Sequence, residues 1–340
     1  MPDPIRIAII GTGLIVTGKH WPALRTLPRD FRVIALVNRT PAKAEALAET
    51  IHAATRSRPA VYTDYRQMLA AEKPDAVALA LPPELNPEVA QTALAAGSHV
   101  IVEKPIAVSL AEGARMLPWA AQYGRVLMVA ENYRYVASYR RAAQLIAEGV
   151  IGPPQVMRWT FYAYMPQDNP YYLTAWRRNP QHPGGYLSDQ GVHNMAALRM
   201  MLGEVTHISG QTLLVRPDLI PADTLSATLR FANGCLGTYA ATHAVPGPEQ
   251  PLQVAGPDGV LSVWRDRMGL WRRGRPVDER SLPSEEDGLV AMYRDFSEAI
   301  RTGQPPRSTP AEALADLRLI VAMLRASELR QEIRVADIPT

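Results

Sequence analysis

Residues 7–24 of the chain read IAIIGTGLIVTGKHWPAL, and they give the strongest indication of the fold. An apolar strand leads directly into a pair of glycines, and a helical segment follows them. Glycines in this position let the backbone turn tightly and approach a diphosphate, which the N-terminus of the next helix stabilises. The pattern therefore predicts a nucleotide-binding turn, with cofactor contacts at Gly11, Gly13, Leu14 and Ile15.

Strand and helix continue to alternate through the first 134 residues. Apolar strands are expected at 31–40 (FRVIALVNRT), 75–83 (DAVALALPP), 98–105 (SHVIVEKP) and 125–134 (RVLMVAENYR), with helices at 41–54, 86–97 and 109–124. Near-continuous apolar strands separated by helices are typical of a parallel sheet that is covered on both faces. We therefore expect an α/β dinucleotide-binding domain over residues 1–134, with a doubly wound parallel sheet.

The pattern changes after about residue 135. An amphipathic helix at 138–152 leads into longer, alternating strands at 154–164, 204–215, 224–245 and 259–273, and helices at 289–303 and 310–330 close the chain. Asn233-Gly234 between two alternating runs is a strong hairpin signal. We predict an α+β domain over residues 135–340, an open-faced, mostly antiparallel sheet with helices on one face. Its terminal helices should pack back toward the first domain.

Composition narrows the class of function. The 340 residues are 47% hydrophobic and 20% charged, with a formal net charge of +3, so a folded protein that does not bind nucleic acid is expected. No run approaches the roughly 18 apolar residues of a membrane span. Cys235 is the single cysteine and fits a reducing, cytoplasmic compartment as a small packed side chain. No histidine pair has metal-ligand spacing, and we expect no metal.

The end of the second strand bears on the choice of cofactor. An acidic residue at this position would hold the ribose hydroxyls of NAD. The chain has Asn38 in its place, followed by Arg39, whose guanidinium suits a charge-assisted contact with a 2′-phosphate. We predict that both residues contact the cofactor and that NADP is preferred over NAD.

Glu-Lys-Pro occurs twice, at residues 72–74 and 103–105. Ligands of an open parallel sheet bind beyond the carboxyl ends of its strands. The first copy precedes the strand 75–83, so we expect it only to end a helix and start a strand. The second copy follows the strand 98–105, on the rim of the glycine turn, and only Lys104 is placed to reach a nicotinamide. The same rim should supply further cofactor contacts from Leu81, Pro82 and Glu103.

A second group of candidate residues lies in GGYLSDQGVHN, residues 184–194. Asp189 and His193 are four residues apart, so they share one helix face. A histidine with the reference pKa of about 6.5 suits proton transfer from an alcohol, and Asp189 would orient the hydroxyl and stabilise the imidazolium. We assign both to catalysis and to substrate binding.

Side chains flanking this group extend the predicted site. Asn132 ends the last strand of the first domain and is assigned to the cofactor. In the family that the chain resembles, such positions contact cofactor or substrate, which implies substrate contacts for Arg134, Trp176 and Arg177. A packed aromatic with a solvated arginine explains these positions equally well.

The chain resembles the glucose–fructose oxidoreductase / inositol dehydrogenase (Gfo/Idh/MocA) family over nearly its whole length. The resemblance rests above all on HVIVEKPIAV and GGYLSDQGVHN, supported by GTGLI, VNRTPAKAEALA, LALPP, VAENYRY, IAEGVIG and FSEAIRTGQPPRST. It implies a Rossmann domain followed by an open-faced sheet through which members form dimers or tetramers. It also implies that Lys104 sits between substrate hydroxyl and nicotinamide, after a peptide before Pro105 that is often cis. Relatives often have histidine where this chain has Asn86.

Three functions follow as hypotheses. The leading one is an NAD(P)-dependent oxidoreductase, a dehydrogenase or reductase of sugars, polyols or related hydroxy or keto compounds. His193 would accept the hydroxyl proton while the Lys104 ammonium stabilises charge on the substrate oxygen. Lys104 could itself be the general acid or base, and the sequence does not assign the proton between the two. The alternative is glycoside cleavage through transient oxidation, elimination and re-reduction. A non-catalytic NAD(P) sensor or repressor ranks lowest, since it need not keep these residues together.

Overall fold

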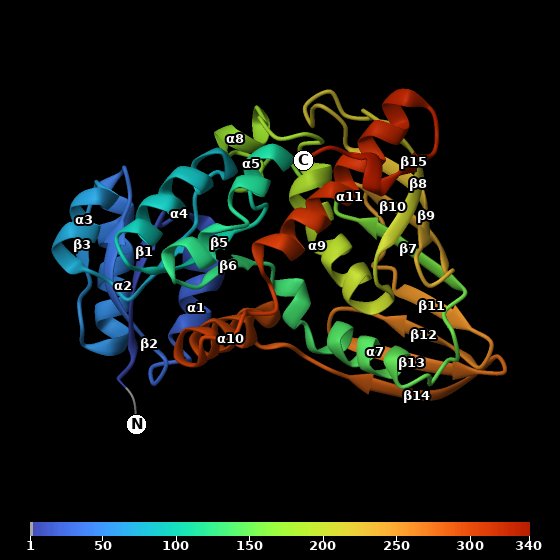
Figure 1. Ribbon diagram of the computed structural model, residues 1–340, viewed down its shortest axis with the longest axis horizontal. Helices are drawn as coiled ribbons and strands as arrows, with labels where there is room; N and C mark the ends of the chain where they lie inside the picture. Colours follow the sequence, from blue (N-terminus) through green and yellow to red (C-terminus); the bar gives the residue numbers. More distant parts are fainter. Residues whose placement is uncertain (1–2) are drawn as a thin grey trace. The chain divides into compact units, whose positions relative to one another are not determined.

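The structure is a computed structural model that describes residues 3–340, and the chain forms two compact units (Figure 1). The first unit comprises the residues up to Val108, Glu112–Glu131 and Leu289–Ala313. The second comprises Ser109–Ala111, Asn132–Gly288 and Leu314–Thr340. The chain thus returns to the first unit after residue 288. The predicted division places one boundary at residue 134 and does not include this return.

A six-stranded parallel sheet forms the centre of the first unit, in the order β3-β2-β1-β4-β5-β6. This order reverses direction between β1 and β4, as in dinucleotide-binding sheets, and confirms the predicted doubly wound fold. Core strands such as β1 and β4 are almost fully buried, which explains their near-continuous apolar sequences. The strands are β1 Ile5–Ile10, β2 Phe31–Val37, β3 Ala60–Tyr62, β4 Ala76–Leu79, β5 His99–Glu103 and β6 Leu127–Ala130.

The helices of this unit follow local signals in the sequence. Asp64 caps one helix by accepting hydrogen bonds from the amides of Arg66 and Gln67. The helix expected at 109–124 is split in two before Pro118, because proline has no amide to donate within a helix. The helices are α1 Trp21–Leu24, α2 Pro41–Thr55, α3 Tyr65–Glu72, α4 Asn86–Ala95, α5 Leu110–Arg115, α6 Trp119–Tyr123 and α10 Leu289–Thr302.

The second unit contains a nine-stranded sheet in the order β14-β13-β12-β11-β7-β10-β9-β8-β15. All neighbouring strands are antiparallel except β7 and β10, which confirms the predicted mostly antiparallel sheet. The strands are β7 Val156–Tyr162, β8 Val205–Leu213, β9 Thr224–Phe231, β10 Leu236–Thr242, β11 Leu252–Gly256, β12 Gly259–Val263, β13 Arg267–Arg272, β14 Arg275–Ser281 and β15 Ile333–Arg334.

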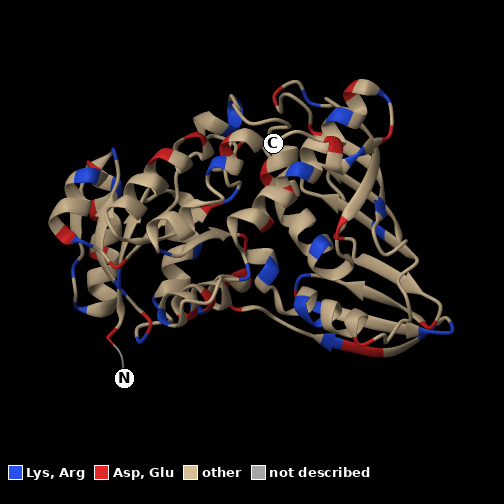
Figure 2. Ribbon diagram, in the orientation of Figure 1, with Lys and Arg blue, Asp and Glu red and all other residues tan. Residues whose placement is uncertain are grey.

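One face of this sheet is covered and the other is open. Burial alternates residue by residue along β9, as expected for a half-buried strand. Helices pack on the covered face, where Asn194 of α9 donates to the hydroxyl of Tyr239 on β10 at 2.8 Å. The edge strand β14 carries charges of both signs (Figure 2), which discourages pairing with another chain. The helices are α7 Ala137–Ala147, α8 Ala175–Arg178, α9 Tyr186–Leu202 and α11 Pro310–Leu329.

Two smaller predictions are also confirmed. Asn233 and Gly234 form the turn between β9 and β10, with Gly234 at a φ of 88°. Cys235 is buried beside this turn, and burial raises the pKa of its thiol to about 11, so it is a packed side chain. Within residues 3–340, no helix has both the length and the hydropathy needed to span a membrane.

Candidate active site

The glycine turn lies between β1 and the first helical segment. Gly11 has a φ of +92°, and a Cβ at this position would lie 2.3 Å from the carbonyl oxygen of Ala80. Only glycine fits there. A Cβ on Gly13 would meet no atom within 4 Å, so the backbone beyond the turn borders open space. One glycine closes the turn and the other leaves room for a group to approach the backbone, as a diphosphate requires.

The helix expected after the turn begins in an unusual form. Leu14 and Ile15 are helical, but η1, Val16–His20, is a π-helix that runs into α1. Leu14 is 40% exposed, and the first amides of a helix have no acceptor within it. The N-terminus therefore suits an anion. Short π-helical segments are rare and are often found at functional sites.

The loop after β2 contains Asn38 and Arg39, the two residues predicted to select between NADP and NAD. The side-chain oxygen of Asn38 accepts from the amide of Thr12 at 3.5 Å, and its amide donates to the carbonyl of Thr40 at 2.9 Å. Asn38 thus ties its own loop to the glycine turn. Arg39 is exposed and has no carboxylate partner among the residues that the structure describes.

The carboxyl end of β4 lies against the same turn. A Cβ on Gly11 would be 3.2 Å from the side chain of Leu81, which places that side chain directly beside the glycines. Pro82 follows as the N-cap of the short helix η2, Pro83–Leu85. Both predicted residues therefore lie on the rim where a bound dinucleotide is expected.

The first Glu-Lys-Pro has the structural role that its position predicts. Lys73 ends α3 in the left-handed conformation, with a φ of 44°. The guanidinium of Arg6 donates to the carbonyls of Glu72 and Lys73 at 2.8 and 3.0 Å. This segment precedes β4, so it lies at the amino edge of the sheet, opposite the glycine turn.

The second Glu-Lys-Pro lies at the carboxyl edge, after β5. Lys104 is half-buried, and its peptide bond to Pro105 is cis, as the family resemblance implies. The fully buried side chain of Asn86 donates to the carbonyls of Glu103 and Pro105 at 3.0 and 3.3 Å. It therefore holds the backbone on both sides of Lys104.

Glu103 has a partner that sequence reasoning missed. Its carboxylate lies 2.7 Å from Nε2 of His20, a residue that the sequence analysis does not assign to the site. No local pattern in the sequence signals this contact, because His20 and Glu103 are 83 residues apart.

In the second unit, Asp189 and His193 lie on α9, as predicted. The carboxylate of Asp189 accepts from Nε of Arg177 at 2.8 Å, with side-chain exposures of 12% and 15%. The ring of His193 stacks on Tyr133, with 4.7 Å between centroids. A Cβ on Gly185 would lie 2.5 Å from the carbonyl of Ile220, which explains the glycine before this helix.

Trp176 and Arg177 join this cluster. The guanidinium of Arg177 lies over the ring of Trp176 at 4.0 Å and over that of Tyr171 at 5.0 Å. The arginine therefore bridges an aromatic surface and the carboxylate of Asp189. Such a combination suits a hydroxylated ring, which offers both apolar C–H faces and hydroxyl donors.

The remaining two predicted residues make internal contacts. Arg134 is 6% exposed and forms an ion pair of 2.6 Å with the buried Asp316, a contact that favours a structural role over substrate binding. The side-chain amide of Asn132 donates to the carbonyl of Asp287 at 2.8 Å. Its assignment to the cofactor stays a prediction.

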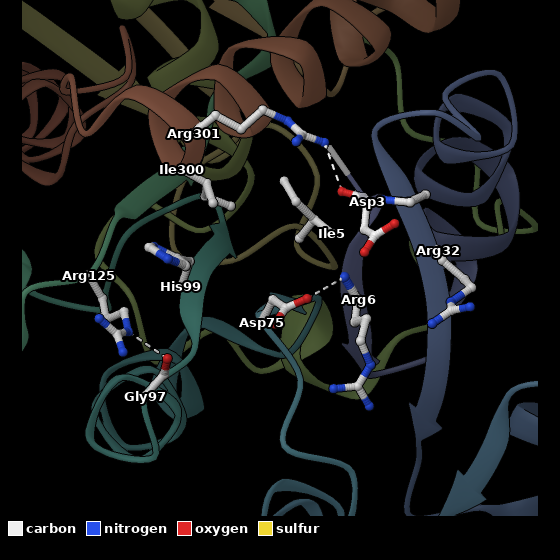
Figure 3. Close-up of a pocket in the computed structure, with 11 residues that line it drawn as sticks. Asp3, Ile5, Arg6, Arg32, Asp75, Gly97, His99, Arg125, Ile300 and Arg301 are labelled. Carbon is white, nitrogen blue, oxygen red and sulfur yellow. Dashed lines mark hydrogen bonds between the residues drawn. The ribbon is translucent and has the colours of Figure 1, made fainter. Parts of the chain in front are cut away.

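A separate hollow of about 680 Å³ opens at the amino edge of the parallel sheet (Figure 3). His99 lies in its wall, and burial, followed by the charge of Arg125, lowers the pKa of its imidazole. The hollow contains none of the predicted site residues. The polar and charged lining side chains are Asp3, Arg6, Arg32, Asp75, His99, Arg125 and Arg301.

Comparison with known proteins gives consistent matches. Residues 5–131 match the family described as "Oxidoreductase family, NAD-binding Rossmann fold", and residues 139–262 match the "GFO/IDH/MocA C-terminal domain". An uncharacterised protein of Saccharomyces cerevisiae is 30% identical over 96% of each chain. D-xylose 1-dehydrogenase (NADP⁺) 2 of Haloferax volcanii is 26% identical, covering 94% of this chain and 96% of the relative.

A solved structure also matches the chain over both units. The crystal structure of an oxidoreductase from Thermotoga maritima superposes with a TM-score of 0.90 at 33% identity. The superposition covers 98% of this chain and 99% of the other. Both units of the present chain are therefore found together in that protein.

Proposed function

Because this chain belongs to the Gfo/Idh/MocA family of oxidoreductases, we propose that it transfers hydride between NADP and a hydroxyl-bearing carbon of a sugar or polyol. Membership makes it an NAD(P)-dependent oxidoreductase acting on CH–OH groups. The name of the Haloferax relative, a D-xylose dehydrogenase that uses NADP⁺, supports both the substrate class and the cofactor.

One observation carries the proposal. The glycine turn after β1, the side chain of Leu81 after β4 and Lys104 after β5 all lie at the carboxyl edge of one parallel sheet. A dinucleotide held by this edge is bound at the turn and along the strand ends. When bound, its nicotinamide ring accepts or gives the hydride. The chain itself must bind the substrate, orient it and move the hydroxyl proton.

Two side chains are available for that proton. We assign its transfer to His193, because an imidazole both accepts and returns protons near neutral pH. The ammonium of Lys104 would stabilise negative charge on the substrate oxygen. Asp189, held by Arg177, would accept a hydrogen bond from a substrate hydroxyl and balance an imidazolium on the same helix face.

Turnover tests the proposal directly. Purified protein is supplied with NADP⁺, and with NAD⁺ in parallel, together with a panel of aldoses and polyols. We expect the nicotinamide absorbance band to grow with at least one substrate. Product formation from glycosides without this change would support oxidation–elimination instead. Cofactor binding with no turnover of any kind would support the sensor hypothesis.

Replacing Arg39 with alanine tests the cofactor assignment. The expected result is an increase of about ten- to hundredfold in the KM for NADP, because a charge-assisted contact with the 2′-phosphate is lost. The KM for NAD should stay within about threefold, since NAD lacks this phosphate. Arg32→Ala, an exposed arginine near the opposite end of β2, is the matched control. Equal effects on both cofactors would contradict the assignment.

We also propose that the open sheet face joins copies of the chain into a homo-oligomer. Val156 on β7 and Leu236 on β10 are paired neighbours, and each side chain is 56% exposed. Adjoining aliphatic side chains on an open face form part of an apolar surface that a second copy of the chain would cover. We expect Val156→Asp/Leu236→Asp to reduce the mass measured by light scattering to that of a smaller assembly. Val277→Asp, on the edge strand β14, should not. An unchanged mass would contradict this interface.

A further inference from the structure

Three side chains from distant segments meet inside the first unit. His20 ends η1, Glu103 ends β5 and Tyr293 lies on α10. Nδ1 of His20 is 2.6 Å from the Tyr293 hydroxyl, and Nε2 is 2.7 Å from the Glu103 carboxylate. The side chains of His20 and Glu103 are 3% and 13% exposed, and Tyr293 is fully buried.

Donor and acceptor accounting fixes the direction of the hydrogen bond between His20 and Glu103. A carboxylate only accepts, so Nε2 of His20 carries the hydrogen that reaches Glu103. Burial first, and the charge of Glu103 second, raise the pKa of the Tyr293 phenol far above its ordinary value. The phenol therefore keeps its proton, and it donates to Nδ1 of the imidazole tautomer that carries its hydrogen on Nε2. Tyr293 thus selects the imidazole tautomer that binds Glu103.

Packing holds this arrangement in one geometry. The ring of Tyr293 lies edge-on to His20 and to Phe31, with centroids 5.8 and 5.6 Å apart. Phe296, one turn further along α10, stacks on Phe31 at 6.3 Å. Edge-on contacts of this kind restrict the orientation of each ring. The imidazole therefore cannot turn away from Glu103 without breaking both hydrogen bonds and this packing.

We propose that His20 is a positioning residue for Lys104, oriented by Tyr293. Glu103 immediately precedes Lys104, so an anchored Glu103 side chain fixes the strand end from which the lysine extends. Asn86 holds the neighbouring carbonyls, and His20 holds the side chain before the lysine. The backbone is thereby restrained through two independent contacts. This role rests on the proposed function of Lys104, where a displacement of about 1 Å costs about 100-fold in rate.

Substitutions of His20 and of Tyr293 measure how much the anchored Glu103 contributes to turnover. We expect His20→Leu to lower kcat by about 100-fold while the dissociation constant for the cofactor stays within about threefold. His20→Gln should recover most of this loss, because its amide donates to Glu103 in place of Nε2. Tyr293→Phe keeps the packing and should lower kcat by about tenfold, as the tautomer is no longer selected. The control for general damage is His99→Leu, because His99 is a half-buried, hydrogen-bonded histidine of the same unit.

A double-mutant cycle separates positioning from general destabilisation. If His20 acts through Lys104, adding His20→Leu to Lys104→Met lowers kcat no further. A full second loss of about 100-fold in the double variant would overturn the proposal.

Lysine labelling provides a readout that does not need activity. The chain has only four lysines, Lys19, Lys43, Lys73 and Lys104, so mass spectrometry resolves the rate at which an amine-reactive ester modifies each. We expect His20→Leu to change the labelling rate of Lys104 by threefold or more, while Lys43 and Lys73 stay unchanged.

The outcomes distinguish this inference from the proposed function. If the wild type turns over no sugar or polyol, the proposed function fails, and the labelling rates still decide whether His20 positions Lys104. If folded His20→Leu leaves both the labelling rate and kcat unchanged, the inference is wrong. If His20→Leu does not fold, Tyr293→Phe decides by the same two measurements, and unchanged values there overturn it.

Discussion

Lys104→Met is expected to lower kcat by about 1,000-fold while cofactor affinity stays within about threefold. Methionine keeps the length and flexibility of the side chain but carries no charge, so only the ammonium is lost. Removing one donor that stabilises developing charge on a substrate oxygen costs about 100- to 1,000-fold, and proton transfer contributes on a similar scale. Steady-state kinetics give kcat, and quenching of protein fluorescence by the cofactor gives its affinity.

The chain contains its own matched control for this experiment. Lys73→Met makes the identical change in the other Glu-Lys-Pro, at the amino edge of the same sheet. We expect its kcat to stay within about twofold of the wild type, because its role is to end α3. Equal losses in the two variants, or no loss at Lys104, would remove the lysine from the mechanism.

His193→Asn is expected to lower kcat/KM by about 100- to 1,000-fold and to remove the acidic limb of the pH–rate profile. Asparagine retains hydrogen bonding but cannot accept the proton of an alcohol at these pH values. The profile of kcat/KM reports the acid and base of the free enzyme, so the limb disappears with the group that produces it. Rates measured between about pH 5 and 9 on the substrate found by screening provide the test.

His207→Asn is the control for that variant, because His207 is a half-buried histidine on β8 that bonds only to neighbouring Thr206 among the described contacts of its ring. Its pH–rate profile should match that of the wild type. If His193→Asn retains the acidic limb and Lys104→Met loses it, the proton acceptor is the lysine and the histidine only orients the substrate.

Local patterns were sufficient to predict the elements nearest to the cofactor. Buried parallel strands carry continuous apolar runs, and a glycine turn between strand and helix has few alternative explanations, so the first sheet could be predicted from the sequence. The two copies of Glu-Lys-Pro could be told apart because the position of a tripeptide relative to its strand fixes the edge on which it lies.

Other features depend on contacts that no local pattern encodes. The strand β3 has three half-buried residues, too few to show a period. The amphipathic pattern of α10 predicts one buried face but not the sheet against which it packs. His20 and Tyr293 are 273 residues apart, and a hydrogen bond between them has no signature in either segment. Only the folded chain reveals that the carboxylate of Glu103 pairs with His20.

The return of the chain to the first unit at residues 289–313 has consequences for the order of folding and for the design of chimeras. Tyr293 and Phe296 fill the space beside β2, and the amide of Val129 on β6 donates to the carbonyl of Ser308 at 2.9 Å. During synthesis, we therefore expect the first unit to complete its core only after residues 289–313 have left the ribosome. A chimera that exchanges this half between relatives must carry residues 289–313 with it, as a second, non-contiguous insert.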